Sequence, residues 1–264
     1  MKKIVCCVGT RDRPSELAFL LLSLKSQTVQ DWDAFILEDC SGTPWQNYHF
    51  LNCIITRLRA EGHIVEIERS PYPYGVSKMR QHLADKSVSR GYDFICRLDD
   101  DVFLEPDYLQ KLLSVIHQGY DITSGVTPFA GQAHLKRDPD NLPKVINRVV
   151  LGTDGKHIYN GDDCGIQYLG EEILPADHFR SSALYKSKIH KEGINYTPTR
   201  LSKHGFREEQ LFSYKAIIAG FKIGVHTGAI SWHLLTPSGG ERFSDQNELI
   251  KLNQEVFEEE TIKL

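Results

Sequence analysis

The chain lacks a membrane-spanning hydrophobic run, a signal-type leader and any excess of positive charge. No stretch of its 264 residues approaches 18 consecutive apolar residues, so we expect no transmembrane helix. The apolar segment 4–8 is too short for a signal peptide, because Arg11 and Arg13 follow it closely. The net charge of −4 gives no electrostatic reason to expect binding to nucleic acid or to an anionic membrane.

Zinc-type cysteine spacings are also missing, since no Cys-x-x-Cys pair is present. Several of the six cysteines lie in apolar runs, where free cysteine behaves as a small hydrophobic residue. We interpret them as packing residues; they are Cys6, Cys7, Cys40, Cys53, Cys96 and Cys164. A reducing, cytoplasmic compartment fits this cysteine usage best, and peripheral association with a membrane stays open.

What is present in the first half is an alternation of strand-like and helical segments. This alternation is typical of a mainly parallel sheet with helices on both faces. The length and the hydrophobic fraction of 41% suit one large domain. The expected strands are 4–8, 34–37, 64–67, 94–98 and 122–126, and the expected helices are 15–26, 45–60, 77–87 and 108–117.

The alternation weakens over residues 127–203, which are rich in Gly, Asp, Asn and Pro. This stretch is too long for a plain loop, so we interpret it as short strands and turns that shape a binding site. Beyond it, helical periodicity returns. The further expected elements are strand-like pieces at 145–151 and 157–159, a helix at 208–219, a strand pair at 223–226 and 229–234, and an acidic amphipathic helix over 241–264.

Three consecutive aspartates, Asp99, Asp100 and Asp101, end the apolar run 92–98. Such a run indicates a buried strand, and its carboxyl end lies where open α/β sheets bind ligands. Three adjacent like charges call for compensation, which a divalent cation holding a phosphate would supply. Oxygen ligands suit magnesium, manganese or calcium. The alternative is an acidic turn that caps the next helix, since Glu105 follows.

Several segments resemble, in order, those of family-2 glycosyltransferases with a GT-A fold. They are the opening Val8-Gly9-Thr10-Arg11-Asp12-Arg13-Pro14, the strand that ends in Glu38-Asp39, the segment Gly75-Val76-Ser77-Lys78-Met79-Arg80, the D-x-D-like Leu98-Asp99-Asp100-Asp101, the acidic pair Glu208-Glu209 before a helix, and His233 followed by Pro237-Ser238-Gly239-Gly240. The resemblance covers about residues 1–240.

The resemblance implies an α/β fold of the GT-A nucleotide-diphospho-sugar transferase type. We expect a mainly parallel central sheet flanked by helices, with a second small β region. We also expect one domain over 1–264: a nucleotide-sugar-binding half at 1–126, an acceptor-binding and catalytic half at 127–240, and a helical tail at 241–264.

For the nucleotide-sugar donor, the resemblance implies a set of binding residues in the first half. Thr10 and Asp39 match positions that hold the base and ribose, and Arg80 matches an arginine that faces the base or phosphate. Arg11 and Arg13 could assist phosphate binding. The alternatives are turn caps for Thr10 and Asp39 and solvated surface charges for the arginines. A UDP-sugar is favoured over a GDP-sugar.

The resemblance also implies a metal centre. Asp99 and Asp100 match ribose-side positions, Asp101 matches the direct metal ligand, and His233 could complete the site. An imidazole ligand favours Mn²⁺ over Mg²⁺, because it is softer than a carboxylate. The segment 235–245 is expected to act as a lid that brings Arg242 onto the diphosphate.

The late acidic pair carries the expected catalytic base. Glu208 or Glu209 would take the proton from an acceptor hydroxyl as its oxygen attacks the anomeric carbon, which inverts the configuration. A placed base typically contributes roughly 10²–10⁴-fold to the rate. The family usually has Glu-Asp here, so the identity of the base is open by one residue, with Glu208 preferred. The alternative is a pair of ordinary first-turn acids.

The acceptor is the least defined part. Asp177, His178 and Ser181 could hydrogen-bond sugar hydroxyls, and Trp232 could stack on a sugar ring. For each aromatic residue, core packing is the better interpretation. The acceptor could be a glycan, a lipid-linked sugar, a protein or a modified nucleobase, so a nucleic-acid acceptor stays among the candidates.

Two other functions compete with glycosyl transfer. A sugar-1-phosphate nucleotidyltransferase would need a glycine-rich basic loop after the first strand, whereas only Gly9 stands there. A nucleotide- or glycan-binding protein without catalysis would not require the aspartates together with Glu208 and Glu209. The sequence therefore favours a metal-dependent inverting glycosyltransferase.

Overall fold

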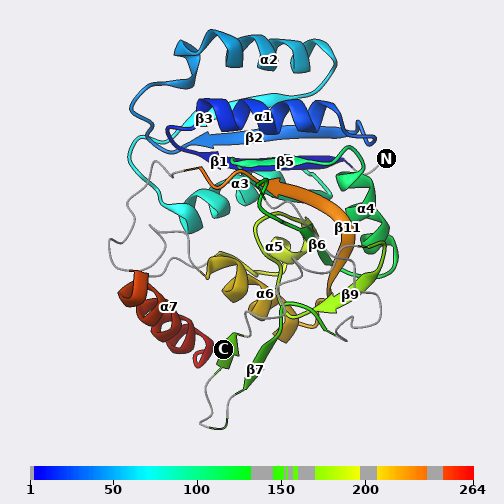
Figure 1. The fold of residues 1–264 in the computed structure, drawn as a ribbon, viewed down its shortest axis with the longest axis vertical. Helices are drawn as coiled ribbons and strands as arrows, with labels where there is room; N and C mark the ends of the chain where they lie inside the picture. Colours follow the sequence, from blue (N-terminus) through cyan, green and yellow to red (C-terminus); the bar gives the residue numbers. More distant parts are fainter. Residues whose placement is uncertain are drawn as a thin grey trace.

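A mixed nine-stranded sheet organises the part of the chain that the structure describes (Figure 1). The computed structural model describes residues 3–131, 145–151, 153, 157–159, 170–196, 207–236 and 246–264. The main path of the sheet runs β3-β2-β1-β4-β10-β6-β11-β5, and β9 pairs with β11 outside this path. This arrangement confirms the predicted α/β class.

The first four strands form a parallel block, as the sequence predicts. They are β1 (Ile4–Thr10), β2 (Trp32–Glu38), β3 (Val65–Arg69) and β4 (Phe94–Asp99). Strand β1 is buried on both faces, because alternate side chains enter different clusters: Ile4, Cys6 and Val8 on one side, Val5 and Cys7 on the other.

Helices cover the two faces of this block (Figure 1). On one face lies α1 (Pro14–Lys25), with α2 (His49–Ala60) packed on it; α4 (Tyr108–His117) shares their hydrophobic cluster but packs on the later strands of the sheet. Leu20, Leu21 and Leu24 of α1 are fully buried there. On the other face lies α3 (Val76–Ser89), whose Leu83 and Ala84 join the second cluster.

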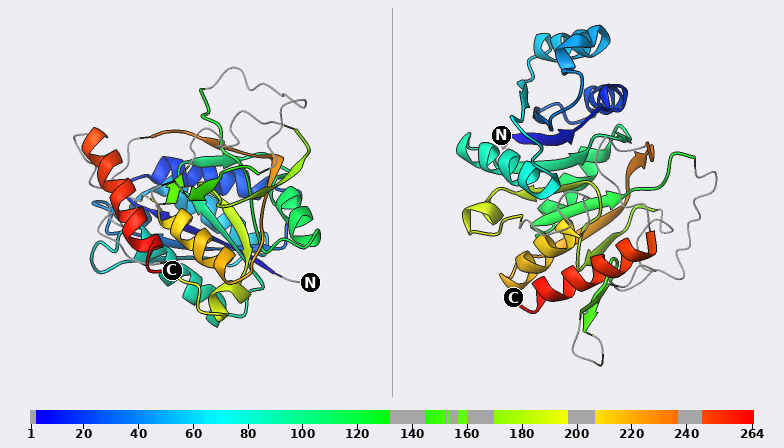
Figure 2. Two further views of the ribbon diagram at one scale, coloured as in Figure 1. Left: turned by 90° about the horizontal axis from the view of Figure 1, so that it is seen from below. Right: turned by 90° about the vertical axis from the view of Figure 1, so that its left-hand side faces the viewer.

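Five later strands complete the sheet. They are β5 (Val102–Leu104), β6 (Ile122–Val126), β9 (Ile173–Ala176), β10 (Ala183–Lys186) and β11 (Ile223–His233). Helices α5 (Lys188–Lys191) and α6 (Glu208–Ile218) follow on the α3 side of the sheet, and α7 (Gln246–Thr261) packs on α6. The predicted small β region is the antiparallel pair β7 (Val149–Leu151) and β8 (His157–Tyr159), which projects from the main sheet (Figure 2).

Three expectations from the sequence need correction. The helix expected at 45–60 is split, because Tyr48 takes an extended conformation between the short 3₁₀ helix η1 (Trp45–Asn47) and α2. The strand pair expected at 223–234 is one strand, β11, whose pairing with β6 shifts register between Val225 and Ile230. Four short elements, β5, β9, β10 and α5, were not predicted.

Two predictions from the sequence concern the cysteines, which were expected to be packing residues, and the expected lack of a transmembrane helix. Cys6, Cys7 and Cys96 are buried and free, as packing residues would be, whereas Cys53 is exposed and Cys164 lies outside the described residues. None of the helices among the described residues combines the length and the apolar character needed to cross a membrane.

The register shift between β6 and β11 places a glycine where no side chain fits. A Cβ atom on Gly125 would lie 1.9 Å from the Ala229 carbonyl oxygen and 2.9 Å from the Tyr108 ring. We therefore expect Gly125→Ala to lower the free energy of unfolding by about 1–3 kcal/mol, the usual cost of overpacking. Chemical denaturation of the purified variant measures the change.

Gly131→Ala is the matched control, since a Cβ atom there meets no atom of the described residues within 4 Å. Equal stability of the two variants would show that β11 can move away from Gly125.

Candidate active site

The parallel order of β1, β2 and β4 brings the predicted donor residues to one edge of the sheet. Thr10 pairs in register with Glu38, and Gly9 with Asp99. The side chains after these strand ends therefore lie at neighbouring carboxyl ends, where ligands bind in open α/β sheets.

Asp100 and Asp101 face Arg13. The Arg13 Nη1 atom lies 2.8 Å from Asp100 Oδ1 and 3.2 Å from Asp101 Oδ2. Thr10 donates its hydroxyl to the other Asp100 oxygen at 2.8 Å. Burial raises the pKa of Asp100 to about 6, although Arg13 and Thr10 oppose that shift. Arg13 also donates to the Thr236 carbonyl at 2.6 Å, which ties the aspartates to the chain after β11.

His233 lies beside Asp101, as the metal hypothesis requires. Pairing of β11 with β5 sets His233 opposite Val102, and Leu234 N donates to the Asp101 carbonyl at 2.8 Å. His233 Nε2 is 3.2 Å from Asp101 Oδ1, and this contact raises the pKa of His233 above its usual value.

The donor set at Asp101 and His233 fits a divalent ion that is shared with a phosphate ligand. One carboxylate and one imidazole approach each other closely enough to bind one ion together. Among the described residues, no group of three or more His, Cys, Asp or Glu side chains is placed to hold a metal. Such an ion would take its remaining ligands from water and from a diphosphate, which is common for Mg²⁺ in nucleotide sites.

Asp99 faces a different set of partners from Asp100 and Asp101. Its Oδ1 atom lies 3.1 Å from Arg80 Nη2 and 3.2 Å from Arg97 Nη2, and its Oδ2 atom accepts the Ser181 hydroxyl at 2.7 Å. The three aspartates therefore divide, with Asp99 directed toward α3 and the end of α6 that carries the acidic pair.

The acidic pair lies next to this arginine cluster. Glu208 forms an ion pair with Arg80, and its Oε1 atom is 3.7 Å from Arg97 Nη2. Glu209 Oε2 lies farther from Arg80, at 3.7 Å from its Nη1 atom. The Glu208 side chain is 2% exposed, whereas the Glu209 side chain is 16% exposed. Arg80 therefore connects the strand that carries the aspartates to the helix that carries the glutamates.

Asp39 makes its contacts within the fold. Its carboxylate accepts hydrogen bonds from the Ser70 hydroxyl at 2.9 Å, from Tyr74 N at 2.7 Å and from Gly75 N at 3.2 Å. Asp39 thus holds the loop that leads into α3 and Arg80. Arg11 lies 3.9 Å from its neighbour Asp12 and is partly exposed. Arg242 and residues 237–245 of the expected lid lie outside the described residues.

Of the acceptor candidates, Ser181 contacts the acidic cluster, because its hydroxyl donates to Asp99. Asp177 accepts the backbone N–H of Val149 at 2.9 Å, and Trp232 donates to Glu105 at 2.7 Å. His178 is fully buried; burial lowers its pKa to about 4, so the ring stays neutral at pH 7.

Arg97 is the site residue that the sequence did not assign. It stands inside the apolar run of β4 and is 3% exposed. Its guanidinium contacts Asp99, Glu208 and the Ser181 carbonyl, and it lies 5.7 Å from the Phe179 ring centroid. A lone arginine in a buried strand is the signal that could have revealed it, because a buried charge needs a partner.

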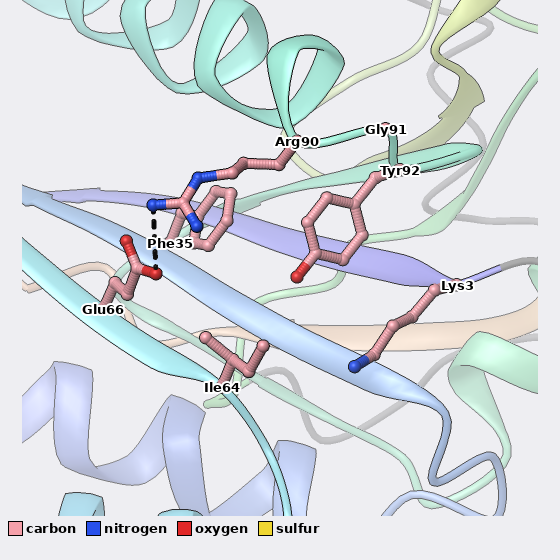
Figure 3. A pocket seen from close by; sticks show the side chains of 7 residues that line it. All are labelled: Lys3, Phe35, Ile64, Glu66, Arg90, Gly91 and Tyr92. Atoms are coloured by element: carbon pink, nitrogen blue, oxygen red, sulfur yellow. Dashed lines mark ion pairs between the residues drawn. The ribbon is translucent and has the colours of Figure 1, made fainter.

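A pocket of about 290 Å³ lies at the opposite edge of the sheet (Figure 3). Lys3, Ile64 and Tyr92 line it, and they immediately precede or lie close to the amino ends of β1, β3 and β4. None of the predicted donor, metal or catalytic residues lines this pocket. We therefore do not assign it to the candidate active site.

The burial of Arg97 predicts a large loss of stability when its charge is removed. Arg97→Ala leaves Asp99 and Glu208 short of a buried counter-charge, and breaking a buried pair costs about 3–5 kcal/mol. Denaturant unfolding at neutral pH measures this loss. Arg57→Ala is the control, because Arg57 pairs with Glu61 at a side-chain exposure of 67%. Similar small effects of both substitutions would contradict a buried ionic cluster around Arg97.

Comparison with solved structures identifies the same fold at low sequence identity. S. aureus TarS 1-349 in complex with UDP-GlcNAc superposes with a TM-score of 0.62 at 14% identity, covering 95% of this chain and 64% of that one. GalNAc-T7 with UDP, GalNAc and Mn2+ gives 0.64 at 13% identity, covering 90% of this chain and 44% of that one. S. aureus TarS itself gives 0.59 at 17% identity, with coverage of 89% and 37%. The chain thus spans 37% to 64% of the length of these proteins.

No curated protein matches the chain by sequence. The sequence model of glycosyl transferase family 2, however, matches residues 5–167, which is more than half of the chain and includes β1, β2 and the three aspartates. The fold and this match together show that the chain belongs to glycosyl transferase family 2, with a GT-A fold.

Proposed function

We propose that the chain is a metal-dependent, inverting glycosyltransferase that moves a sugar from a nucleotide-diphosphate donor to an acceptor hydroxyl. The observation that carries this proposal is the excess of carboxylates over guanidinium groups at the carboxyl edge of the sheet. Five carboxylates gather there: Asp99, Asp100, Asp101, Glu208 and Glu209. Among the described residues, three guanidinium groups face them, from Arg13, Arg80 and Arg97.

The excess of negative charge supports a divalent cation as the missing partner. Asp101 and His233 are the residues that would hold it, and a bound ion would neutralise charge on the leaving diphosphate. Crystal structures of the compared proteins contain UDP-GlcNAc, or UDP with Mn2+ and GalNAc. These complexes support a UDP-sugar as the donor class and manganese as the ion. Thr10 and Asp39 would border the nucleotide, with Asp39 acting through the loop that it holds.

Burial distinguishes the two candidates for the base. A base must come within hydrogen-bond reach of the acceptor hydroxyl, at about 2.6–3.2 Å. Glu208 is enclosed by Arg80 and Arg97, whereas Glu209 is more exposed and lies farther from Arg80. This geometry favours Glu209 as the base and Glu208 as the residue that anchors the start of α6.

In the proposed reaction, Glu209 takes the hydroxyl proton while the acceptor oxygen forms a bond to the anomeric carbon. The bond from that carbon to the diphosphate oxygen breaks, and the diphosphate leaves with the electron pair. A single displacement of this kind inverts the configuration of the sugar. The division into a donor half at 1–126 and an acceptor half at 127–240 remains part of the proposal, as does a reducing, cytoplasmic setting.

The metal assignment predicts the behaviour of Asp101→Ala. We expect this variant to lose the part of UDP affinity that depends on Mn²⁺, because one of the two protein ligands is gone. Calorimetric titration of UDP with and without Mn²⁺ measures that part directly. Asp107→Ala is the matched control: it also removes an aspartate close to the motif in sequence, but Asp107 pairs with Lys111 at the surface. An unchanged metal-dependent affinity in Asp101→Ala would rule out Asp101 as a ligand.

The base assignment predicts different outcomes for the two glutamates. Glu209→Gln should lower turnover by at least about 100-fold with little change in donor affinity, because an amide cannot accept the proton. Glu208→Gln should mainly lower thermal stability, because its ion pair with Arg80 is weakened. The reverse pattern would make Glu208 the base. Full turnover in both variants would refute general-base catalysis by this pair.

A further inference from the structure

The residue that precedes the acidic pair has an unusual backbone conformation. Arg207, at the N-terminal cap of α6, has φ 64° and ψ 2°, in the left-handed region. Residues other than glycine, asparagine and aspartate rarely adopt this conformation, because their Cβ atom approaches the carbonyl oxygen. Contacts elsewhere must therefore hold Arg207 in place.

The C-terminal helix supplies those contacts. Arg207 Nη2 donates to Gln254 Oε1 at 3.0 Å, and the guanidinium carbon lies 5.0 Å from the centroid of the Phe257 ring. Phe257 is fully buried, and Val256 beside it is 2% exposed. Figure 2 shows α7 alongside α6 in both views. The side chain of Arg207 is thus fixed on α7 while its backbone begins α6.

The backbone conformation of Arg207 sets the directions in which the Glu208 and Glu209 side chains point at the start of α6. Its carbonyl oxygen accepts the N–H of Leu211 at 3.0 Å, which closes the first turn around Glu208 and Glu209. Glu208 must then reach Arg80 on α3 and Arg97 on β4. A change of φ at Arg207 would redirect both glutamates, since they follow it directly in the chain.

We propose that Arg207 is a positioning residue and that α7, through Gln254 and Phe257, is part of the catalytic unit. The proposal rests on the proposed role of the acidic pair and adds a residue and a helix to it. Arg207 acts by holding the left-handed start of α6, without contacting the substrate. Its charge therefore matters less than the backbone geometry that its side chain secures.

A comparison of three substitutions at Arg207 tests this role. In Arg207→Ala the left-handed conformation remains unfavourable for the residue, and the contacts with α7 that hold it are lost. We expect kcat to fall about 10-fold or more with the donor KM unchanged, since a displacement of ~1 Å can cost up to ~100-fold. Arg207→Gly also loses the contacts, but glycine adopts the left-handed conformation readily. It should recover most of the turnover lost in Arg207→Ala, and Arg207→Lys should lie between Arg207→Ala and the unmodified protein.

The helix α7 supplies a second, independent test. Phe257→Leu removes the ring under Arg207 while keeping an apolar side chain. As a single substitution, Phe257→Leu should lower kcat. Combined with Arg207→Gly, it should have little further effect. Lys251→Ala, on the exposed face of α7, is the control and should leave kcat unchanged, because the Lys251 side chain is 80% exposed. Counting UDP sites by calorimetry corrects each rate for the folded fraction of the sample.

Equal losses in Arg207→Ala and Arg207→Gly would overturn the proposal, because the charge and not the backbone would then matter. Unchanged turnover in both would overturn it as well. Parallel assays of Glu208→Gln and Glu209→Gln separate this failure from that of the proposed function. If a glutamate variant is inactive while Arg207→Ala is fully active, only the positioning role fails. If both glutamate variants keep full turnover, the proposed function fails first.

Discussion

The compensation of clustered carboxylates by buried arginines is the constraint on which the rest of the site depends. The Glu208 side chain is nearly fully buried and the Asp99 side chain is partly buried, so an uncompensated charge there would be costly. Arg80 and Arg97 supply the counter-charges from α3 and β4. Because these arginines contact both acids, the end of β4 and the start of α6 hold each other in register. Ion pairs thus connect the aspartate end of β4 to the glutamate end of α6.

The place where the candidate site residues meet could be predicted from the sequence, because parallel strands impose it. Once β1, β2 and β4 are parallel neighbours, Thr10, Asp39 and the three aspartates must meet at one edge. The role of each side chain did not follow so directly. Asp39 and Asp99 were both assigned to the donor, yet in the fold each is engaged by residues from other segments: Asp39 by the loop 70–75, Asp99 by two arginines and Ser181. These partners lie far away in the chain, so the residues next to Asp39 and Asp99 in the sequence do not reveal them.

The short strands could not be predicted for the same physical reason, which is their dependence on distant partners. Strand β10 has four residues and lies antiparallel between β4 and β6, so its pairing depends on segments that are about 60 to 90 positions away in the chain. Its pattern, Ala183-Leu184-Tyr185-Lys186, is too short for periodicity to distinguish a strand from a turn. Long periodic helices were predicted well for the opposite reason. The helix α4 begins and ends where its leucine and isoleucine spacing predicts, because one amphipathic face decides its packing.

The left-handed conformation at Arg207 fits the same account of strain and compensation. A residue under backbone strain persists only where the surrounding structure determines its position, and such residues gather at functional sites. Two sets of contacts fix the position of Arg207: α7 holds its side chain, and the ion pairs of Glu208 hold the residue after it. Helix α7 lies beyond the part of the chain that matches the family model, which ends at residue 167. The part of the chain that matches the family model therefore contains the three aspartates, whereas the acidic pair and the proposed positioning contacts of Arg207 with α7 belong to the later part.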